Sequence, residues 1–147
     1  MRHRQLHERG NAVIEFALGL SVLALLFTGI FQFGWSFYQY NRVQTLVSNA
    51  AVLAARLDFD ADQPALYTNA IRNMVVYGSP DGGTIPIVSG LSTANINVNV
   101  NPSGGMPTDV TITVRAFTIN AVFARYNMTN KPRVTSVYMG HIVCSYC

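Results

Sequence analysis

The chain's long apolar stretch opens with Arg-Gly-Asn-Ala-Val-Ile-Glu-Phe-Ala-Leu, residues 9–18. Glu15 lies five residues after Gly10, and no formally charged residue follows it until Arg42. A carboxylate costs roughly 2.5–3.5 kcal/mol in the middle of a bilayer, so Glu15 needs a partner that the neighbouring apolar sequence does not offer. If the chain is cut after Gly10, Glu15 becomes the fifth residue of a product whose first residue, Asn11, carries a free amine.

The apolar stretch has the length of a membrane span. Twenty-six residues from Phe16 to Asn41 carry no formal charge. As a helix they would extend about 39 Å, enough to cross a hydrocarbon core of about 30 Å. Trp35, Tyr38 and Tyr40 close the stretch, as an aromatic belt at a membrane surface would. A cleaved secretory signal fits poorly, because its apolar core has only about 7–15 residues.

The charge pattern indicates topology. The net charge is +3, and three arginines against one glutamate place +2 of it in residues 1–10. The remainder holds too small an excess to neutralise a run of phosphates, which argues against a nucleic-acid partner. The positive-inside bias predicts a cytoplasmic leader (1–10), a transmembrane part of the N-terminal helix (11–41), and a head across the membrane (42–147).

Helical patterns continue beyond the span. No proline interrupts residues 11–57, which predicts one continuous helix whose second half is amphipathic. Pro64 suits the start of a second helix, capped by Asp62 or Gln63, and Gly78 suits its end. The expected apolar faces are Val43, Leu46, Val47, Ala50, Leu53, Ala54 and Leu57 on the first helix, and Leu66, Ala70, Ile71, Met74 and Val75 on the second.

After the second predicted helix, polar and apolar residues alternate with a period of two. Asn95–Asn101 alternates without exception, Pro102–Pro107 provides a loop, and apolar residues alternate again from Val110 to Ala116. This pattern predicts a hairpin whose loop is longer than a two-residue turn.

Three further segments complete the expected head. Arg133–Val143 has the pattern of another strand, Thr84–Val88 is a weaker strand candidate, and Thr118–Tyr126 is ambiguous. The sequence therefore predicts an α+β, pilin-like fold with a long N-terminal helix, a second short helix, and an antiparallel sheet of about three to four strands.

The N-terminal third resembles a known family. Gly10–Leu18 is similar to the processing motif of TadE-like minor pilins (pseudopilins) of tight-adherence pili, and Gly29-Ile30 and Asn49–Arg56 resemble that family too. Two positions depart from the family pattern: Ser21 stands where relatives often carry proline, and Gln32 where an acidic residue is common.

The resemblance implies processing and assembly. A membrane prepilin peptidase would cut between Gly10 and Asn11, and glycine there leaves the backbone accessible. Glu15 and Phe16 would act in assembly, with the new N-terminal ammonium of one subunit neutralising Glu15 of its neighbour. The implied partners are major and other minor pilin subunits, an inner-membrane assembly platform and lipid. The implied location is the bacterial inner membrane, with incorporation into a pilus for surface attachment.

Two side-chain clusters have simpler interpretations. After Cys144 and Cys147 no residues remain for the helix of a redox motif, and too few ligands lie nearby for zinc. In an oxidising compartment a disulfide is the sounder interpretation, either within the chain or to another subunit. The Asp58–Asp62 segment lacks the glycine and the distal glutamate of a calcium loop. We therefore expect neither a metal site nor a cofactor.

Catalysis is also disfavoured. The sequence contains no Ser/His/Asp or Cys/His arrangement and no paired carboxylates on one face, and we expect no enzyme. The rival to a pilin subunit is an unprocessed, single-span scaffolding or binding module of an envelope secretion complex, with Glu15 hydrated at headgroup level. Four aromatic residues are expected to fill the small core or a subunit contact: Phe117, Phe123, Tyr126 and Tyr138.

Overall fold

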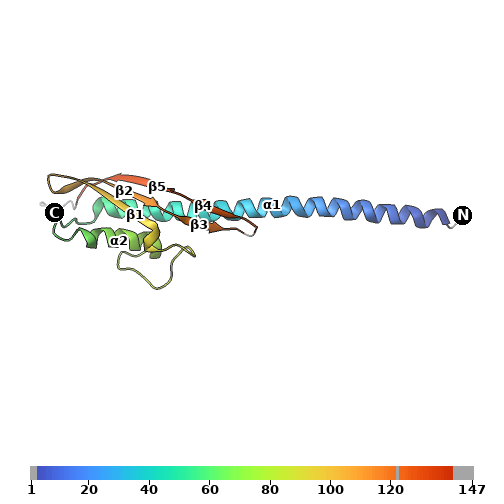
Figure 1. Cartoon of the computed structure of the whole chain (residues 1–147), viewed down its shortest axis with the longest axis horizontal. Helices are drawn as coiled ribbons and strands as arrows, with labels where there is room; N and C mark the ends of the chain where they lie inside the picture. The colour runs from blue at the N-terminus through green and yellow to red at the C-terminus, as the bar shows by residue number, and fades with distance from the viewer. Residues whose placement is uncertain (1–2, 122, 141–147) are drawn as a thin grey trace, which may run out of the picture.

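One uninterrupted helix forms the long axis of the molecule (Figure 1). The computed structural model describes residues 3–121 and 123–140. Helix α1 (His3–Arg56) has 54 residues, which corresponds to a length of about 80 Å. The expected continuous helix is thus confirmed, and it begins eight residues before Asn11. The remaining elements gather along its C-terminal part and form the head, whereas its N-terminal part projects alone (Figure 1).

Helix α2 (Pro64–Tyr77) begins and ends where the sequence predicts. Gln63 occupies the N-cap position but makes no side-chain capping bond. Gly78 adopts the left-handed conformation (φ 75°), and its N–H donates to the carbonyl of Met74 at 3.0 Å. Only glycine adopts this φ without steric cost, which explains why the helix ends there.

The buried faces of both helices differ in part from the expected ones. Leu66 is 64% exposed, whereas Tyr67 and Val76 are buried with Ile71 and Val75. On α1, the expected Leu53 and Leu57 are only half-buried, whereas Ala51 and Ala55 are buried. The sequence pattern located each apolar face within about one residue, and tertiary packing selected which of the adjacent side chains enter the core.

Three strands form the main sheet, in the order β1-β2-β5. They are β1 (Ile96–Ser103), β2 (Met106–Val114) and β5 (Arg133–Val137), and both pairings are antiparallel. A single 3₁₀ turn, η1 (Thr93–Asn95), precedes β1.

The β1–β2 hairpin is confirmed, but its connection is shorter than expected. Ser103 pairs with Met106, so only Gly104 and Gly105 form the turn, and both have positive φ (63° and 85°). Two such residues match the twist of the adjoining strands. A register shift after Asn101 accommodates the proline that follows it within the strand. At the other end β2 stops at Val114, and Ala116, expected in the strand, is exposed with φ 48°.

Two other strand predictions differ from the structure. Thr84–Val88 is not a strand; Ile87 N–H donates one bond to the Val76 carbonyl (2.9 Å), and buried Val88 covers the core. The predicted strand at 133–143 ends at Val137, and residues 141–143 lie outside the described part.

The ambiguous segment from Thr118 contributes to a separate pair of antiparallel strands, β3 (Phe117–Asn120) and β4 (Arg125–Met128). These strands lie along α1, on the side of the head nearer the projecting helix (Figure 1).

The fold is α+β, as predicted, with helices α1 and α2 packed against one face of the main sheet. Strand β2 provides the centre of the core with Val110, Ile112 and Val114, each fully buried. The opposite face of the sheet is polar, and on it the hydroxyl oxygens of Thr111 and Thr135 lie 2.9 Å apart in a hydrogen bond.

The C-terminal end of α1 is held by side chains and backbone from other elements. The last turn of a helix leaves carbonyls without helical donors. Here the Tyr67 hydroxyl donates to the Ala54 carbonyl, and the Met139 N–H donates to the Ala55 carbonyl at 2.9 Å. The Tyr67 ring makes edge contacts with Phe59 and Tyr138. Burial, and secondarily the neighbouring Tyr138, raise the pKa of the Tyr67 phenol.

Candidate functional site

The part of α1 that projects from the head is apolar, and no other described element packs against it. Every residue from Asn11 to Phe31 is exposed, and within the described residues this is the helix long and apolar enough to cross a membrane. Its 21 residues correspond to about 32 Å, close to the thickness of a hydrocarbon core. The exposed large apolar side chains are Val13, Ile14, Phe16, Leu18, Leu20, Val22, Leu23, Leu25, Leu26, Phe27, Ile30 and Phe31.

Such a surface does not remain in water, because exposing apolar area is unfavourable by about 25 cal/mol per Å². The projecting segment therefore requires lipid or other apolar helices around it.

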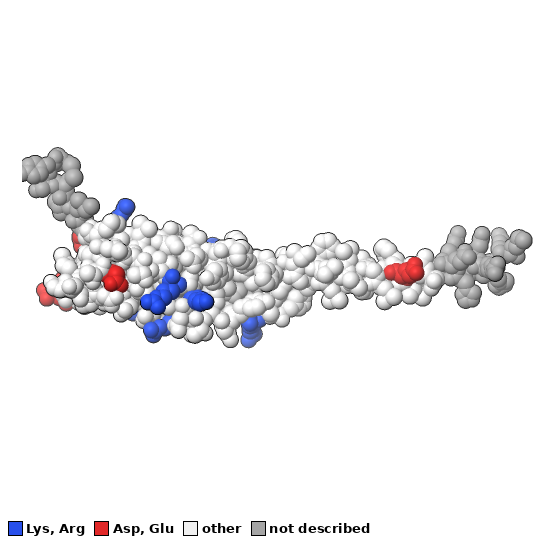
Figure 2. All heavy atoms as spheres, turned by 90° about the horizontal axis from the view of Figure 1, so that it is seen from above, with Lys and Arg blue, Asp and Glu red and all other residues white. Residues whose placement is uncertain are grey.

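Glu15 is the one carboxylate on this surface. From Asn11 to Arg56 it is the sole acidic residue of α1. Its side chain is exposed, and it has no ion-pair partner among the side chains of residues 11–121 and 123–140. Figure 2 shows acidic atoms on the projecting helix far from the other acidic side chains, which gather at the opposite end of the head.

The other predicted site residues lie next to Glu15 or outside the described range. Gly10 and Asn11 are consecutive residues of the helical backbone, with no break between leader and span. Phe16 is 71% exposed. The residues that the sequence predicts to act in processing and assembly therefore lie on one continuous helix. Cys144 and Cys147 lie outside the described residues, so their pairing remains a prediction.

The head first covers α1 at Gln32, which is only 9% exposed. Its Oε1 accepts a hydrogen bond of 2.9 Å from the backbone N–H of Phe123, in the turn that joins β3 to β4. The Phe123 side chain is itself 74% exposed. The sequence pattern marks Gln32 only as a missing charge. The signal for a polar contact is an amide in the middle of a charge-free, largely apolar run, because buried polar groups require partners.

The expected aromatic core is only partly present. Phe117 is buried and Tyr138 is partly buried in the core, as expected. Phe123 and Tyr126 are exposed, so they do not fill the core, and the alternative of a subunit contact stays a prediction for them. Both belong to the β3–β4 region, which is too short to enclose large rings on two sides.

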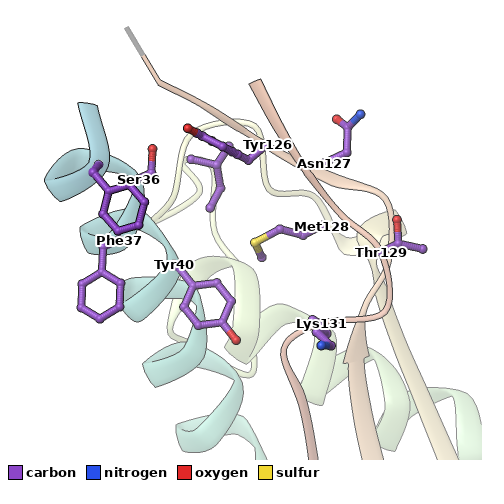
Figure 3. A pocket seen from close by; sticks show the side chains of 10 residues that line it. Ser36, Phe37, Tyr40, Tyr126, Asn127, Met128, Thr129 and Lys131 are labelled. Atoms are coloured by element: carbon purple, nitrogen blue, oxygen red, sulfur yellow. The ribbon is translucent and has the colours of Figure 1, made fainter. Parts of the chain in front are cut away.

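A groove opens between α1 and the β3–β4 pair (Figure 3). Its volume is about 540 Å³. Figure 3 shows Tyr126 and Met128 directed from β4 towards α1, and Tyr40 directed from α1 towards the opposite wall. Lys131 is the one charged residue in the lining. The lining residues are Phe33, Ser36, Phe37, Tyr40, Ile119, Tyr126, Asn127, Met128, Thr129 and Lys131.

The described part of the chain contains no group of three or more His, Cys, Asp or Glu side chains that could hold a metal ion. The features that remain are the bare apolar rod, its one carboxylate, and the groove where the rod enters the head.

A comparison with known protein families finds a match within helix α1. Residues 10–52 match the family model described as TadE-like protein. The chain carries a TadE-like segment. This segment begins at Gly10, includes Glu15 and Gln32, and ends within α1, before the sheet begins. No curated protein and no solved structure matches the chain.

Proposed function

We propose that this chain is a minor pilin-like subunit that is cleaved after Gly10 by a prepilin peptidase and assembles into a tight-adherence-type pilus for surface attachment. The observation that carries the proposal is the bare apolar helix with a single carboxylate, at the start of the TadE-like segment. Cleavage after Gly10 would place the new ammonium of Asn11 four residues before Glu15.

The geometry of α1 supports a single membrane span. Residues 11–31 would occupy the hydrocarbon core, since their length of about 32 Å matches it. Residues 32–41, the rest of the stretch expected to span, would lie at the interface, because the head first contacts α1 at Gln32. Residues 1–10 would be the cytoplasmic leader, and the head would face the periplasm.

Assembly would provide Glu15 with a partner that the side chains of residues 11–121 and 123–140 do not offer. In a bundle of apolar helices, a carboxylate is tolerated when a cation approaches it, and the ammonium of a neighbouring subunit is such a cation. Its neighbours would be major and other minor pilin subunits, held at an inner-membrane assembly platform. Removing one partner of a buried ion pair costs about 3–5 kcal/mol, which corresponds to a loss of affinity of more than 100-fold.

The test is the Glu15→Ala variant, expressed with the other pilus components and followed by fractionation and by recovery with sheared pili. We expect membrane insertion to persist, because a charge is removed from the span, and incorporation to fall by at least 100-fold. Asp81→Ala, which removes a carboxylate from the exposed turn after α2, is the matched control and should assemble normally. Normal incorporation of Glu15→Ala would contradict the proposed role of Glu15, and absence of the unmodified chain from the sheared pili would favour an unprocessed scaffolding module.

A further inference from the structure

We propose that the groove between α1 and the β3–β4 pair binds an anionic phospholipid, with an acyl chain against its apolar walls and the phosphate near Lys131. The inference rests on the membrane insertion proposed above but not on processing or on pilus assembly. It concerns the described residues of the head alone.

The position of the groove is the first argument. Its α1 wall runs from Phe33 to Tyr40 and begins two residues after the last residue of the bare segment, Phe31. If residues 11–31 fill the hydrocarbon core, this wall lies at the level of the headgroups. The groove therefore faces the layer in which phospholipid phosphates and the upper parts of acyl chains are found.

The lining matches the two ends of a lipid. Phe37 and Met128 provide apolar walls, and Phe37 is 60% exposed although it is a large apolar side chain. The Tyr40 and Tyr126 hydroxyls and the Lys131 ammonium provide donors for a phosphate. Aromatic rings with a polar end are enriched at membrane interfaces for this reason.

The charge around the groove favours an anionic headgroup. No acidic residue occurs from Phe16 to Leu57 or from Val110 to Gly140, the segments that supply α1, β3, β4 and β5. Cations do occur there, including Arg42, Arg125 and Lys131. Figure 2 shows the acidic side chains of the head at the end away from the projecting helix, with basic side chains lying nearer to it. This arrangement directs positive potential towards the membrane surface.

A second copy of the chain is the less suitable occupant. A symmetric dimer places the same patch on both sides of the interface. Here that would bring the cations near the groove, Arg125 and Lys131, towards their own counterparts without any acidic residue to compensate. A phosphate, by contrast, neutralises them.

The experiment uses the full chain in lipid nanodiscs with a photoactivatable acyl chain, carried either on phosphatidylglycerol or on phosphatidylcholine. Adducts are mapped by mass spectrometry after proteolysis. We expect labels on residues 11–31 with both lipids, which reports insertion. We also expect labels on residues 33–40 and 126–131, at least threefold more abundant with phosphatidylglycerol.

Two variants and two controls locate the site. Lys131→Gln should reduce groove labelling by phosphatidylglycerol to the phosphatidylcholine level. Tyr126→Ala, at a 44% exposed position, should reduce it with both lipids. Arg133→Gln on β5 and Met106→Ala at the hairpin turn, an exposed residue outside the groove lining, should leave it unchanged.

Several outcomes would overturn the inference. Labels confined to residues 11–31 would show that the chain inserts but the groove stays empty of lipid. Equal groove labelling by the two lipids would remove the role of Lys131 and the anionic preference. A chain that is dimeric in the nanodiscs and carries no groove label with either lipid would assign the surface to self-association. None of these results would by itself alter the processing or assembly proposal.

Discussion

Replacing Tyr67 by phenylalanine should loosen the end of the head where α1, α2 and the segment after β5 meet. Tyr67 is 2% exposed, and its hydroxyl donates to the Ala54 carbonyl in the last turn of α1. Phenylalanine keeps the ring contacts with Phe59 and Tyr138 and removes only the donor. The change therefore isolates one buried hydrogen bond.

The expected loss of stability follows from the Ala54 carbonyl, which loses its hydrogen-bond donor. A buried acceptor that loses its partner costs about 1–3 kcal/mol. For a folded unit of about 100 residues, each kcal/mol lowers the Tm by about 4–8 °C. We therefore expect the head of Tyr67→Phe to melt about 5–20 °C below that of the unmodified chain, measured by circular dichroism on the full chain in detergent micelles.

The matched control is Tyr77→Phe on the same helix. The Tyr77 hydroxyl makes no hydrogen bond with any described residue, so its loss should change the Tm by no more than about 2 °C. Equal Tm values for the Tyr67 and Tyr77 variants would refute the assigned hydrogen bond and its role in closing α1.

The pH dependence gives a second readout of the same residue. The folded state raises the pKa of Tyr67 above its ordinary value of 10.0. The stabilisation of the folded state by the protonated Tyr67 is therefore complete below pH 10. It is lost as the pH rises towards the pKa of the folded state, because the unfolded chain releases this proton first. The difference in unfolding free energy between the unmodified chain and Tyr67→Phe should shrink above pH 10. A difference that stays constant from pH 8 to 11.5 would contradict the raised pKa.

Two further predictions concern backbone contacts. Gln32→Leu removes the acceptor of the Phe123 N–H, so amide exchange in residues 117–128 should accelerate about tenfold for a loss of about 1.4 kcal/mol. Gln32→Glu keeps an acceptor and should preserve the protection. Gln39→Leu should preserve it too, because the buried Oε1 of Gln39 has no partner among the described residues. Gly78→Ala should lower the unfolding free energy by about 1–2 kcal/mol, since φ is 75° and a Cβ would lie 2.7 Å from the Ile87 side chain, whereas Gly34→Ala, with open space around it, should not destabilise the head.

The long helix and the main hairpin could be predicted because local pattern determines them. Charge-free residues from Phe16 onward and the absence of proline specify α1, and Pro64 and Gly78 mark the two ends of α2. The strict alternation of residues 95–101 specifies β1. In each case the information lies within a few residues of the element it describes.

The remaining features depend on contacts that are distant in sequence. The bond between Gln32 and Phe123 joins residues 91 positions apart. Strands β3 and β4 have only four residues each, so the alternation in Phe117–Asn120 is too short for the period-two rule to identify the pair. Thr84–Val88 has apolar residues that cover the core without a pairing strand. The groove arises from this same packing and has no local signature.

The partner of Glu15 also could not be predicted from geometry within one chain. The described residues give it no ion pair, and the helix is bare around it. The account therefore depends on a new N-terminus, which only cleavage between Gly10 and Asn11 can generate.

The most direct test is the intact mass and N-terminal sequence of the chain after coexpression with a prepilin peptidase. The account predicts a product that lacks residues 1–10 and begins at Asn11, and it predicts that Gly10→Ile keeps the full mass because a branched side chain blocks access to the bond. An unmodified chain that retains residues 1–10 in the presence of active peptidase would contradict the processing claim.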